Sequence, residues 1–284
     1  MNGKQRRFAV VTDSSADLPP ALRAKHGITV VPLTVTLGAE EFADGVDLGP
    51  QEFWQRVARG GDLPRTTQPG PADFARVYQR LYADGMGILS VHLSGEMSGT
   101  VQSARLAAGD FPAGAIRVVD SRSASMGVGF LALAAARMAE EGVALEEAEA
   151  AVRALAGKLE IFFTVDSLEW LRRNGRIGRA QAFLGTLLNV KPVLTIEDGV
   201  VSPVEQVRSR ERSLHRLVEL AREAAAGRTV DVAVVHGDCP EDGERVMAEL
   251  VASIDARERV LVWLGSTIGA HTGPGTLGIV MLPV

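Results

Sequence analysis

The stretch FAVVTDSSADLPP, residues 8–20, decides the fold class. Its apolar run, Phe8 to Thr12, stops at Asp13-Ser14-Ser15, which is typical of a buried parallel strand that enters a polar loop. Because ligands of α/β proteins bind beyond the carboxyl ends of such strands, this loop is a candidate binding site. The N-terminal region is therefore expected to have an α/β fold.

Strands and helices alternate through the first half of the chain. The patterns predict further strands at 29–37, 41–42, 87–92 and 116–120, and helices at 50–59, 71–83, 124–141, 145–159 and from residue 100 onward. A polar loop is expected at 64–71. Such alternation favours a parallel sheet with helices on both faces, so residues 1–160 are predicted to form a three-layer α/β/α lobe.

The pattern changes from residue 161 onward. A strand at 161–165 and a basic helical stretch precede two strands, 192–196 and 200–204, which flank the turn signal Asp198-Gly199. Further helices are predicted at 209–225 and 241–254, and further strands at 231–235, 259–264 and 277–282. Residues 161–284 are therefore predicted to form an α+β lobe with a mixed sheet.

The composition is that of a packed globular protein. Hydrophobic residues make up 46% and charged residues 23% of the 284, and the net charge of −5 argues against general binding of nucleic acid. One cysteine, Cys239, excludes a disulfide framework, and no apolar stretch reaches the roughly 20 residues of a membrane span. No secretion signal is predicted, and the expected location is the cytoplasm.

Sequence motifs for enzymatic chemistry are weak. The repeated glycines at Gly127 and Gly129 are better explained by close helix packing than by nucleotide binding, and the Gly-rich segment from Gly273 precedes a strand where a phosphate site needs a helix. The histidines lack metal-ligand spacing, and the order around Ser98 is not that of a nucleophile elbow. We therefore expect no catalytic residue, no metal and no cofactor.

Hydroxyl groups near predicted strand ends are the more informative feature. Thr66, Thr67 and Ser98, together with His271, are suited to hold an oxyanion or a carboxyl group. Each also has a structural explanation: Ser98 as a helix cap, the threonines as a solvated turn, and His271 as a packing residue. For Asp13, likewise, the structural explanation is that it only caps the helix that follows it. Spacing alone leaves these alternatives open.

Six motifs, in order along nearly the whole chain, resemble the DegV family. They are VTDSSADL at 11–18, TTQP at 66–69, the segment 93–100 that ends in MSGT, DS at 120–121, LRRNGRIGRAQAFLGTLLNVKP at 171–192, and HTGPG at 271–275. One departure is Thr67, where the family more often has serine. It leaves open which of the two threonines faces a ligand.

The resemblance implies a two-lobe protein that holds one long-chain fatty acid between its lobes. The carboxyl group is then expected near the surface, bound by Ser98, His271 and either Thr66 or Thr67. Members of the family act as the fatty-acid-binding subunit of a bacterial fatty acid kinase, and present the carboxyl to a separate ATP-binding subunit that forms acyl phosphate for phospholipid synthesis. The protein is accordingly expected to be a non-catalytic lipid-binding protein.

Two enzymatic functions are the alternatives. One is an acyl hydrolase that uses Ser98 with His271. The other is a dihydroxyacetone-kinase-like enzyme, because the family resembles the substrate lobe of such kinases in fold. The absent nucleophile elbow, third triad acid and ATP motifs favour the lipid-binding protein.

Arginines gather at two places in an otherwise acidic chain. They are Arg172, Arg173, Arg176 and Arg179, and then Arg208, Arg210, Arg212 and Arg216. By resemblance, the segment 207–212 matches a region that docks the kinase subunit, so Arg208 is assigned to partner recognition. The first cluster is assigned to transient contact with an anionic membrane surface. Solvated helix faces are the alternative for both clusters.

Overall fold

The computed structural model describes residues 6–83, 85–185 and 190–284, which form two compact units. Unit 1 consists of the chain up to Leu33 and of Thr67–Gly157, and unit 2 of Thr34–Thr66 and Lys158–Val284. The predicted boundary at residue 160 lies close to the point, between Gly157 and Lys158, where the chain passes from unit 1 to unit 2 for the second time. The predicted division into 1–160 and 161–284 differs from the structure in the segment Thr34–Thr66, which folds with unit 2 because it packs against a helix near the C-terminus.

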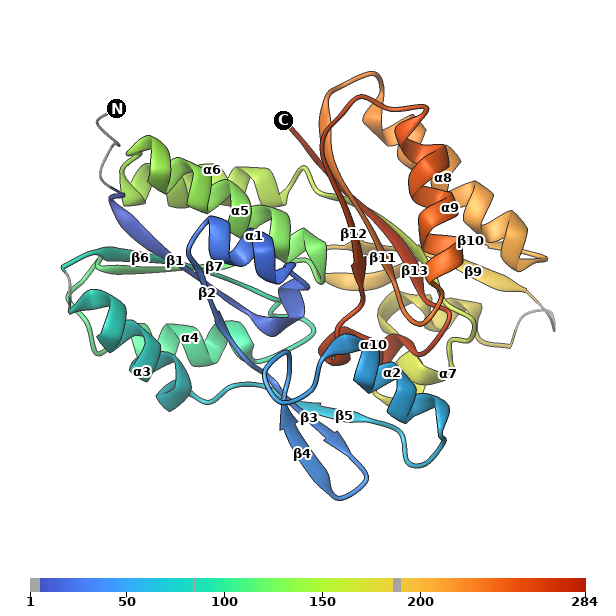
Figure 1. Cartoon of the computed structure of the whole chain (residues 1–284), viewed down its shortest axis with the longest axis horizontal. Coiled ribbons are helices and arrows are strands. Elements are labelled where there is room, and N and C mark those ends of the chain that lie inside the picture. The colour runs from blue at the N-terminus through green and yellow to red at the C-terminus, as the bar shows by residue number, and fades with distance from the viewer. Residues whose placement is uncertain (1–5, 84, 186–189) are drawn as a thin grey trace. The chain divides into compact units, whose positions relative to one another are not determined.

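Unit 1 is a four-stranded, wholly parallel sheet with helices on both faces (Figure 1). Its strands, in spatial order, are β2 (Ile28–Val31), β1 (Phe8–Asp13), β6 (Gly87–His92) and β7 (Ile116–Asp120). Helices α3 (Pro71–Tyr82) and α4 (Thr100–Ala108) cover one face, and α5 (Met126–Glu141) and α6 (Leu145–Ala156) the other. The short elements η1 (Ser14–Ala16) and α1 (Pro20–Lys25) follow β1. The predicted three-layer parallel architecture is confirmed.

Alternation along the strands supplies the core of unit 1. Val11 and Ile88 face α3 and α4, where they pack against Phe74, Tyr78 and Val101. All five side chains are at most 2% exposed, so this face is a dry apolar layer.

Unit 2 contains a six-stranded mixed sheet, as predicted. In spatial order its strands are β10 (Val200–Val207), β9 (Lys191–Glu197), β8 (Glu160–Thr164), β13 (Leu277–Pro283), β11 (Val230–His236) and β12 (Ala256–Trp263). Among the described strand pairs of this six-stranded sheet, only β11 and β12 run parallel to each other. The Asp198-Gly199 turn joins β9 to β10 with φ of 54° and 83°, as the predicted hairpin requires.

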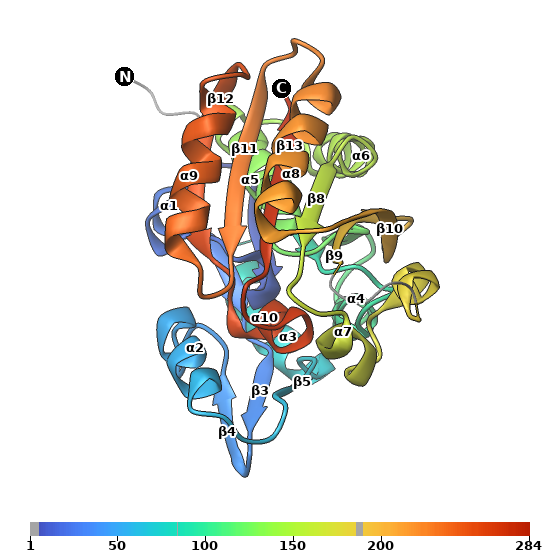
Figure 2. The ribbon, with the colours of Figure 1, turned by 90° about the vertical axis from the view of Figure 1, so that its right-hand side faces the viewer.

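Helices α8 (Arg210–Ala225) and α9 (Pro240–Val251) pack on one face of this sheet (Figure 2). Leu217 and Val218 of α8 and Leu250 of α9 meet Val232 and Ile279 of the strands. The short helix α7 (Glu169–Arg173) and the 3-10 helix η2 (Gly178–Phe183) form the basic stretch after β8. Residues 186–189 of the family-like stretch 171–192 lie outside the described residues.

The segment Thr34–Thr66 adds a small three-stranded sheet and one helix to unit 2. The strands, in spatial order, are β4 (Glu40–Ala43), β3 (Thr34–Leu37) and β5 (Arg65–Thr67), and the helix is α2 (Pro50–Ala58). The structure differs from the expected polar loop at 64–71, because β5 pairs with the edge of β3. Helix α10 (Ser266–Thr272) was not predicted either, and it packs against β3 and α2. Within the described ranges, no helix is long and apolar enough to cross a membrane.

Candidate functional site

The structure brings together two of the predicted site residues, Thr66 and His271. Thr66 Oγ1 lies 2.8 Å from His271 Nε2, although 205 residues separate them in the sequence. Thr66 comes from β5 and His271 from the last turn of α10, both in unit 2. Thr67 is exposed, whereas Thr66 is half-buried, so of the two threonines only Thr66 belongs to this pair.

His271 is uncharged in this environment. Burial, helped by the positive charge of Arg176, lowers the pKa of its imidazole from the ordinary 6.5 to about 4. Its Nδ1 atom is buried and has no hydrogen-bond partner among the described residues. A neutral imidazole with one unused ring nitrogen can donate to, or accept from, a ligand oxygen.

The third predicted residue, Ser98, belongs to unit 1. It lies in the loop between β6 and α4, half-buried, with Oγ 2.8 Å from Thr100 Oγ1 and 3.3 Å from the Thr100 amide that donates to it. The helix-cap interpretation of Ser98 is wrong, because Gly99 is the N-cap of α4 and no side chain caps this helix; Ser98 precedes the cap and contacts only the first helical residue. That contact leaves the hydroxyl with further hydrogen-bonding capacity, because an oxygen has two lone pairs.

Two aspartates hold the loop that carries Ser98. Asp13 accepts from the Leu93 amide at 3.1 Å, and Asp120 accepts from the Gly95 amide at 3.2 Å. Asp13 also caps η1 by accepting from the Ser15 amide, which confirms the capping interpretation of that residue. Side chains at the ends of β1 and β7, the two strands that flank β6, thus fix the position of the loop.

Asp13 belongs to a chain of buried polar groups that resembles a catalytic triad. His92 Nδ1 lies 2.9 Å from Asp13 Oδ2, and His92 Nε2 lies 2.6 Å from Ser90 Oγ. The Tyr78 hydroxyl donates to the same Ser90 oxygen at 2.8 Å. All four side chains are 0% exposed, so no substrate reaches Ser90, and the network serves to position the loops.

Four of the predicted cationic residues are neutralised by acidic neighbours. Arg172 pairs with Glu169, Arg179 with Glu197 and Asp198, Arg210 with Asp242 and Asp166, and Arg216 with Glu205, Glu219 and Glu223. The expected concentration of positive charge is thus smaller than the sequence indicates. Arg208 is exposed and, within the described part of the chain, has no ion-pair partner.

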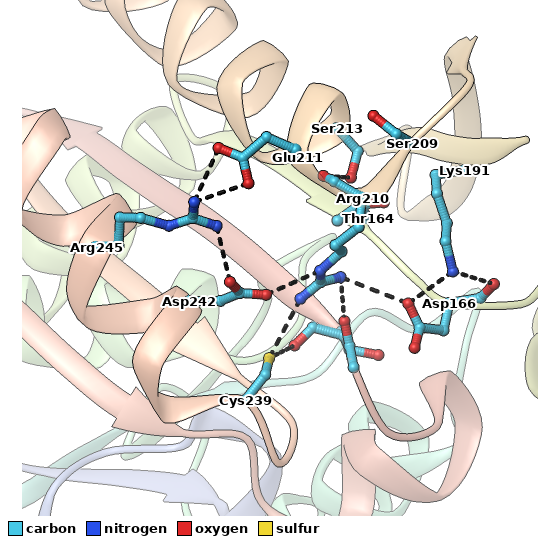
Figure 3. A network of polar contacts seen from close by, with 12 residues as sticks. Thr164, Asp166, Lys191, Ser209, Arg210, Glu211, Ser213, Cys239, Asp242 and Arg245 are labelled. Carbon is cyan, nitrogen blue, oxygen red and sulfur yellow. Dashed lines mark hydrogen bonds and ion pairs between the residues drawn. The ribbon is translucent and has the colours of Figure 1, made fainter.

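Arg210 also braces the loop that follows His271 (Figure 3). Its guanidinium donates to the Gly275 carbonyl, to Asp242 at 3.0 Å and to Cys239 Sγ at 3.3 Å. The loop is tight: a Cβ atom on Gly275 would meet the Asp166 carboxylate at 2.4 Å, and one on Gly273 would meet the Trp170 ring at 2.7 Å. The glycines of HTGPG are therefore required by packing.

A cavity of about 440 Å³ lies in the same unit. Its lining includes Leu37, Val57, Leu63 and Trp170, with Arg59 and Asp62 among its polar groups.

In the described part of the chain, no three acidic, histidine or cysteine side chains are grouped to hold a metal ion.

Two α/β units, one carrying an uncharged hydroxyl–imidazole pair, define a class of two-lobe α/β proteins with a candidate site for a polar head group. The chain belongs to the DegV family, whose model, described as "Uncharacterised protein, DegV family", matches residues 7–284. It is 41% identical over 278 residues to a DegV domain-containing protein of Streptomyces coelicolor, covering 97% of this chain and 98% of the relative. It is 36% identical to Protein DegV of Bacillus subtilis, covering 96% and 98%.

Solved structures of the family superpose over the whole fold. One is a DegV family protein of Thermus thermophilus whose structure shows fatty acid binding. It matches this chain with a TM-score of 0.93 and 41% identity, and the match covers 98% of this chain and 100% of the other. DegV of Bacillus subtilis, described as a fatty acid binding protein, has a TM-score of 0.90 and 33% identity, covering 98% and 100%. A stearic-acid-binding protein of Eubacterium ventriosum has a TM-score of 0.89 and 29% identity, covering 97% and 98%.

Proposed function

We propose that this protein binds one long-chain fatty acid without a catalytic role of its own, and holds the carboxyl group with Thr66 and His271. Ser98 contributes a third hydrogen bond, a role that rests on the family motif around it. The observation that carries the proposal is the Thr66–His271 pair, in a chain that matches fatty-acid-binding relatives over its full length.

The chemistry of the pair suits a carboxylate that must stay reactive. A hydroxyl and a neutral imidazole provide hydrogen bonds for a partly desolvated head group without a strong ion pair, which an arginine would form. Affinity comes from the tail, because about 14 buried methylenes gain on the order of 11 kcal/mol before ordering costs. The head-group residues thus orient the ligand more than they retain it.

Mass spectrometry of the purified protein tests the proposal. Under native conditions the mass should exceed that of the chain by one fatty acid, which denaturation should release in stoichiometric amount. A protein that carries no fatty acid, takes up none when offered, and hydrolyses acyl esters would instead support the hydrolase alternative.

Substitution of the threonines tests the head-group assignment. Thr66→Val should weaken fatty acid binding by about 5- to 150-fold, since it leaves a buried polar group without its partner at a cost of roughly 1–3 kcal/mol. Thr67→Val is the matched control and should bind like the wild type, because Thr67 is exposed and outside the pair. Ser98→Ala and His271→Ala should weaken binding similarly. If Thr67→Val has the larger effect, the assignment of Thr66 is wrong.

We further propose that the bound carboxylate is presented to a separate ATP-dependent kinase subunit in the cytoplasm. A carboxylate oxygen attacks the γ-phosphorus of ATP held by the partner, an acyl phosphate forms, and ADP leaves with the electron pair of the broken bond. Arg208 is the residue assigned to docking, and its exposure and lack of an ion-pair partner among the described residues support this assignment.

Charge reversal at Arg208 tests the docking role. Arg208→Glu should reduce acyl phosphate formation, trapped as hydroxamate, at low kinase concentration, and leave the bound fatty acid in place. Lys25→Glu is the charge-matched control, because Lys25 is exposed on α1 of unit 1. Equal phosphorylation with Arg208→Glu and with the control, over a range of kinase concentrations, would reject the docking role and leave Arg208 as a solvated surface residue.

Loading of the ligand is proposed to involve transient contact with an anionic membrane surface through the arginines at 172–179. Arg173 is exposed and unpaired within the described ranges, whereas Arg172 and Arg179 have acidic partners. Binding to vesicles with anionic lipid should exceed binding to zwitterionic vesicles and decrease with salt. Arg173→Glu should abolish that difference, and its persistence would assign lipid contact elsewhere.

A further inference from the structure

Helix α10, which carries His271, is too short to be stable without contacts to neighbouring elements. It is seven residues long, shorter than helices that are stable alone, so its position depends on contacts with neighbouring elements. His271 must nevertheless meet Thr66 within hydrogen-bond distance, and Thr66 comes from a strand far away in the sequence. The contacts that hold α10 therefore determine the geometry of the pair.

Asp44 holds the first turn of α10. Its two carboxylate oxygens accept hydrogen bonds from the hydroxyls of Ser266 and Thr267, the first two residues of the helix. Asp44 is 5% exposed, and both hydroxyl residues are buried. A buried carboxylate at a helix N-terminus is favoured by the partial positive charge of the first-turn amides, which have no acceptor within the helix. Because each carboxylate oxygen accepts from a different residue, the two bonds together restrain rotation as well as translation of the helix.

Trp54 holds the residues next to α10. Its indole Nε1 donates to the Leu264 carbonyl at 2.9 Å, two residues before the helix begins. Its ring fills the space above two glycines: a Cβ atom on Gly269 of α10 would lie 2.7 Å from the ring, and one on Gly237 would lie 2.8 Å from it. Trp54 is 1% exposed, so the contact is rigid and dry.

Asp44, Trp54 and Thr66 belong to one continuous piece of chain, the segment Thr34–Thr66. We propose that Asp44 and Trp54 are positioning residues for the head-group pair, which set α10 so that His271 Nε2 meets the Thr66 hydroxyl. The segment thus supplies one member of the pair directly and fixes the other from two sides. The consequence for ligand binding rests on the proposed function, whereas the positioning itself does not.

A positioning role predicts a change at His271 that mere loss of stability does not produce. In ligand-stripped Asp44→Asn, the negative charge at the start of α10 is lost, and an amide donor replaces one of the two carboxylate acceptors, so the hydroxyl that it faces must reverse its hydrogen bond. The helix should loosen, and water should reach the imidazole. Long-range ¹H–¹⁵N NMR of the His271 ring should then show the pKa moving upward from about 4 toward 6.5, together with a mixed tautomer signal.

The matched control is Asp47→Asn. Asp47 lies in the same loop as Asp44, is exposed, and accepts from the Ala43 amide at 2.9 Å; among the described residues it makes no hydrogen bond or ion pair with α10. This control makes the same charge change three residues away. It should leave the His271 signals and the affinity for a saturated sixteen-carbon fatty acid unchanged, while Asp44→Asn should lower that affinity by about tenfold, on the order of 1.4 kcal/mol.

The partner side of the contact provides a second test that does not depend on the stability of Asp44→Asn. Ser266→Ala combined with Thr267→Val removes both hydroxyl donors and should reproduce the shift at His271. Adding Asp44→Asn to this double variant should change the His271 pKa little further, because the interaction is already absent. Trp54→Phe keeps an aromatic ring but loses the bond to Leu264, and should produce a smaller shift in the same direction.

The outcomes separate the two proposals. Unchanged His271 pKa and tautomer in folded Asp44→Asn, or in the Ser266→Ala/Thr267→Val protein, would overturn the positioning role. A wild-type protein that binds no fatty acid but shows the His271 shift on substitution of Asp44 would instead reject the proposed function and retain the positioning role.

Discussion

Cys239 shows how position determines the reactivity of a single residue. It lies under the Arg210 guanidinium, yet burial dominates and raises the pKa of its thiol to about 11. Because the thiolate is the reactive form, the folded protein should react with a disulfide reagent at pH 8 at least tenfold more slowly than the unfolded chain. Absorbance of the released thiol measures both rates. Equal rates would mean that the thiol is accessible and ionised.

His271 should make stability depend on pH in a defined window. Its pKa is about 4 in the folded protein, whereas the unfolded chain has the ordinary value of 6.5, so the unfolded state binds the proton first as the pH falls. The contribution of His271 to stability is complete above pH 6.5 and is lost as the pH falls from 6.5 toward 4.

Denaturant unfolding of wild type and His271→Gln at several pH values checks this dependence. Glutamine does not titrate, so the variant should lose less free energy of unfolding between pH 7 and pH 4 than the wild type. All other titrating groups are common to the two proteins. Parallel curves would place the pKa of His271 near its ordinary value.

Gly129 allows helix α5 to pack closely against the backbone of η1. It lies in α5, where a Cβ atom would meet the Ala16 carbonyl at 2.8 Å and Met126 Sδ at 3.0 Å. Gly129→Ala should therefore reduce the free energy of unfolding by about 1–3 kcal/mol, even though alanine has the better helix propensity. Gly157→Ala is the control, because its nearest neighbour is 3.6 Å away and its φ is −74°. Thermal unfolding of both variants compares them.

The long, regular elements could be predicted from the sequence, and the small ones that build the site could not. Apolar runs and hydrophobic periodicity located β1, β6, α5 and α8 because each buries many apolar side chains in a large core. β5 and α10 are short, and their stability comes from contacts made by distant residues. A local signal for α10 did exist, since Gly265 precedes two hydroxyl residues and Gly273 follows the last turn.

The arginine clusters show the same limitation for charge. The sequence counts cations, but neutralisation of Arg179 and Arg216 depends on acids brought close by the hairpin and by neighbouring helix turns. Arg179 meets Glu197 and Asp198 only because β9 and β10 fold back beside η2. Local sequence therefore overestimates the surface potential.

At the scale of the whole molecule, each unit should respond separately to damage in its own core. Trp54→Ala removes a fully buried side chain of unit 2 at a cost of roughly 3–5 kcal/mol. Amide exchange in β11 and β13 should then accelerate by about a hundredfold or more, and exchange in β1 and β6 should change much less. Phe74→Ala, in the core of unit 1, should show the opposite pattern. Mass-resolved exchange with equal effects in both units would contradict separate cores.

The arrangement of unit 2 also has a consequence for synthesis on the ribosome. Trp54 and the carbonyl it binds are 210 residues apart, so at about 5–20 residues per second the tryptophan waits roughly 10–40 s for its partner. Once synthesis passes Gly157, unit 1 has its whole sequence available, while Phe53 and Trp54 remain attached to it as an apolar loop without a core. A nascent chain paused before residue 264 should therefore be a better chaperone substrate than the finished one.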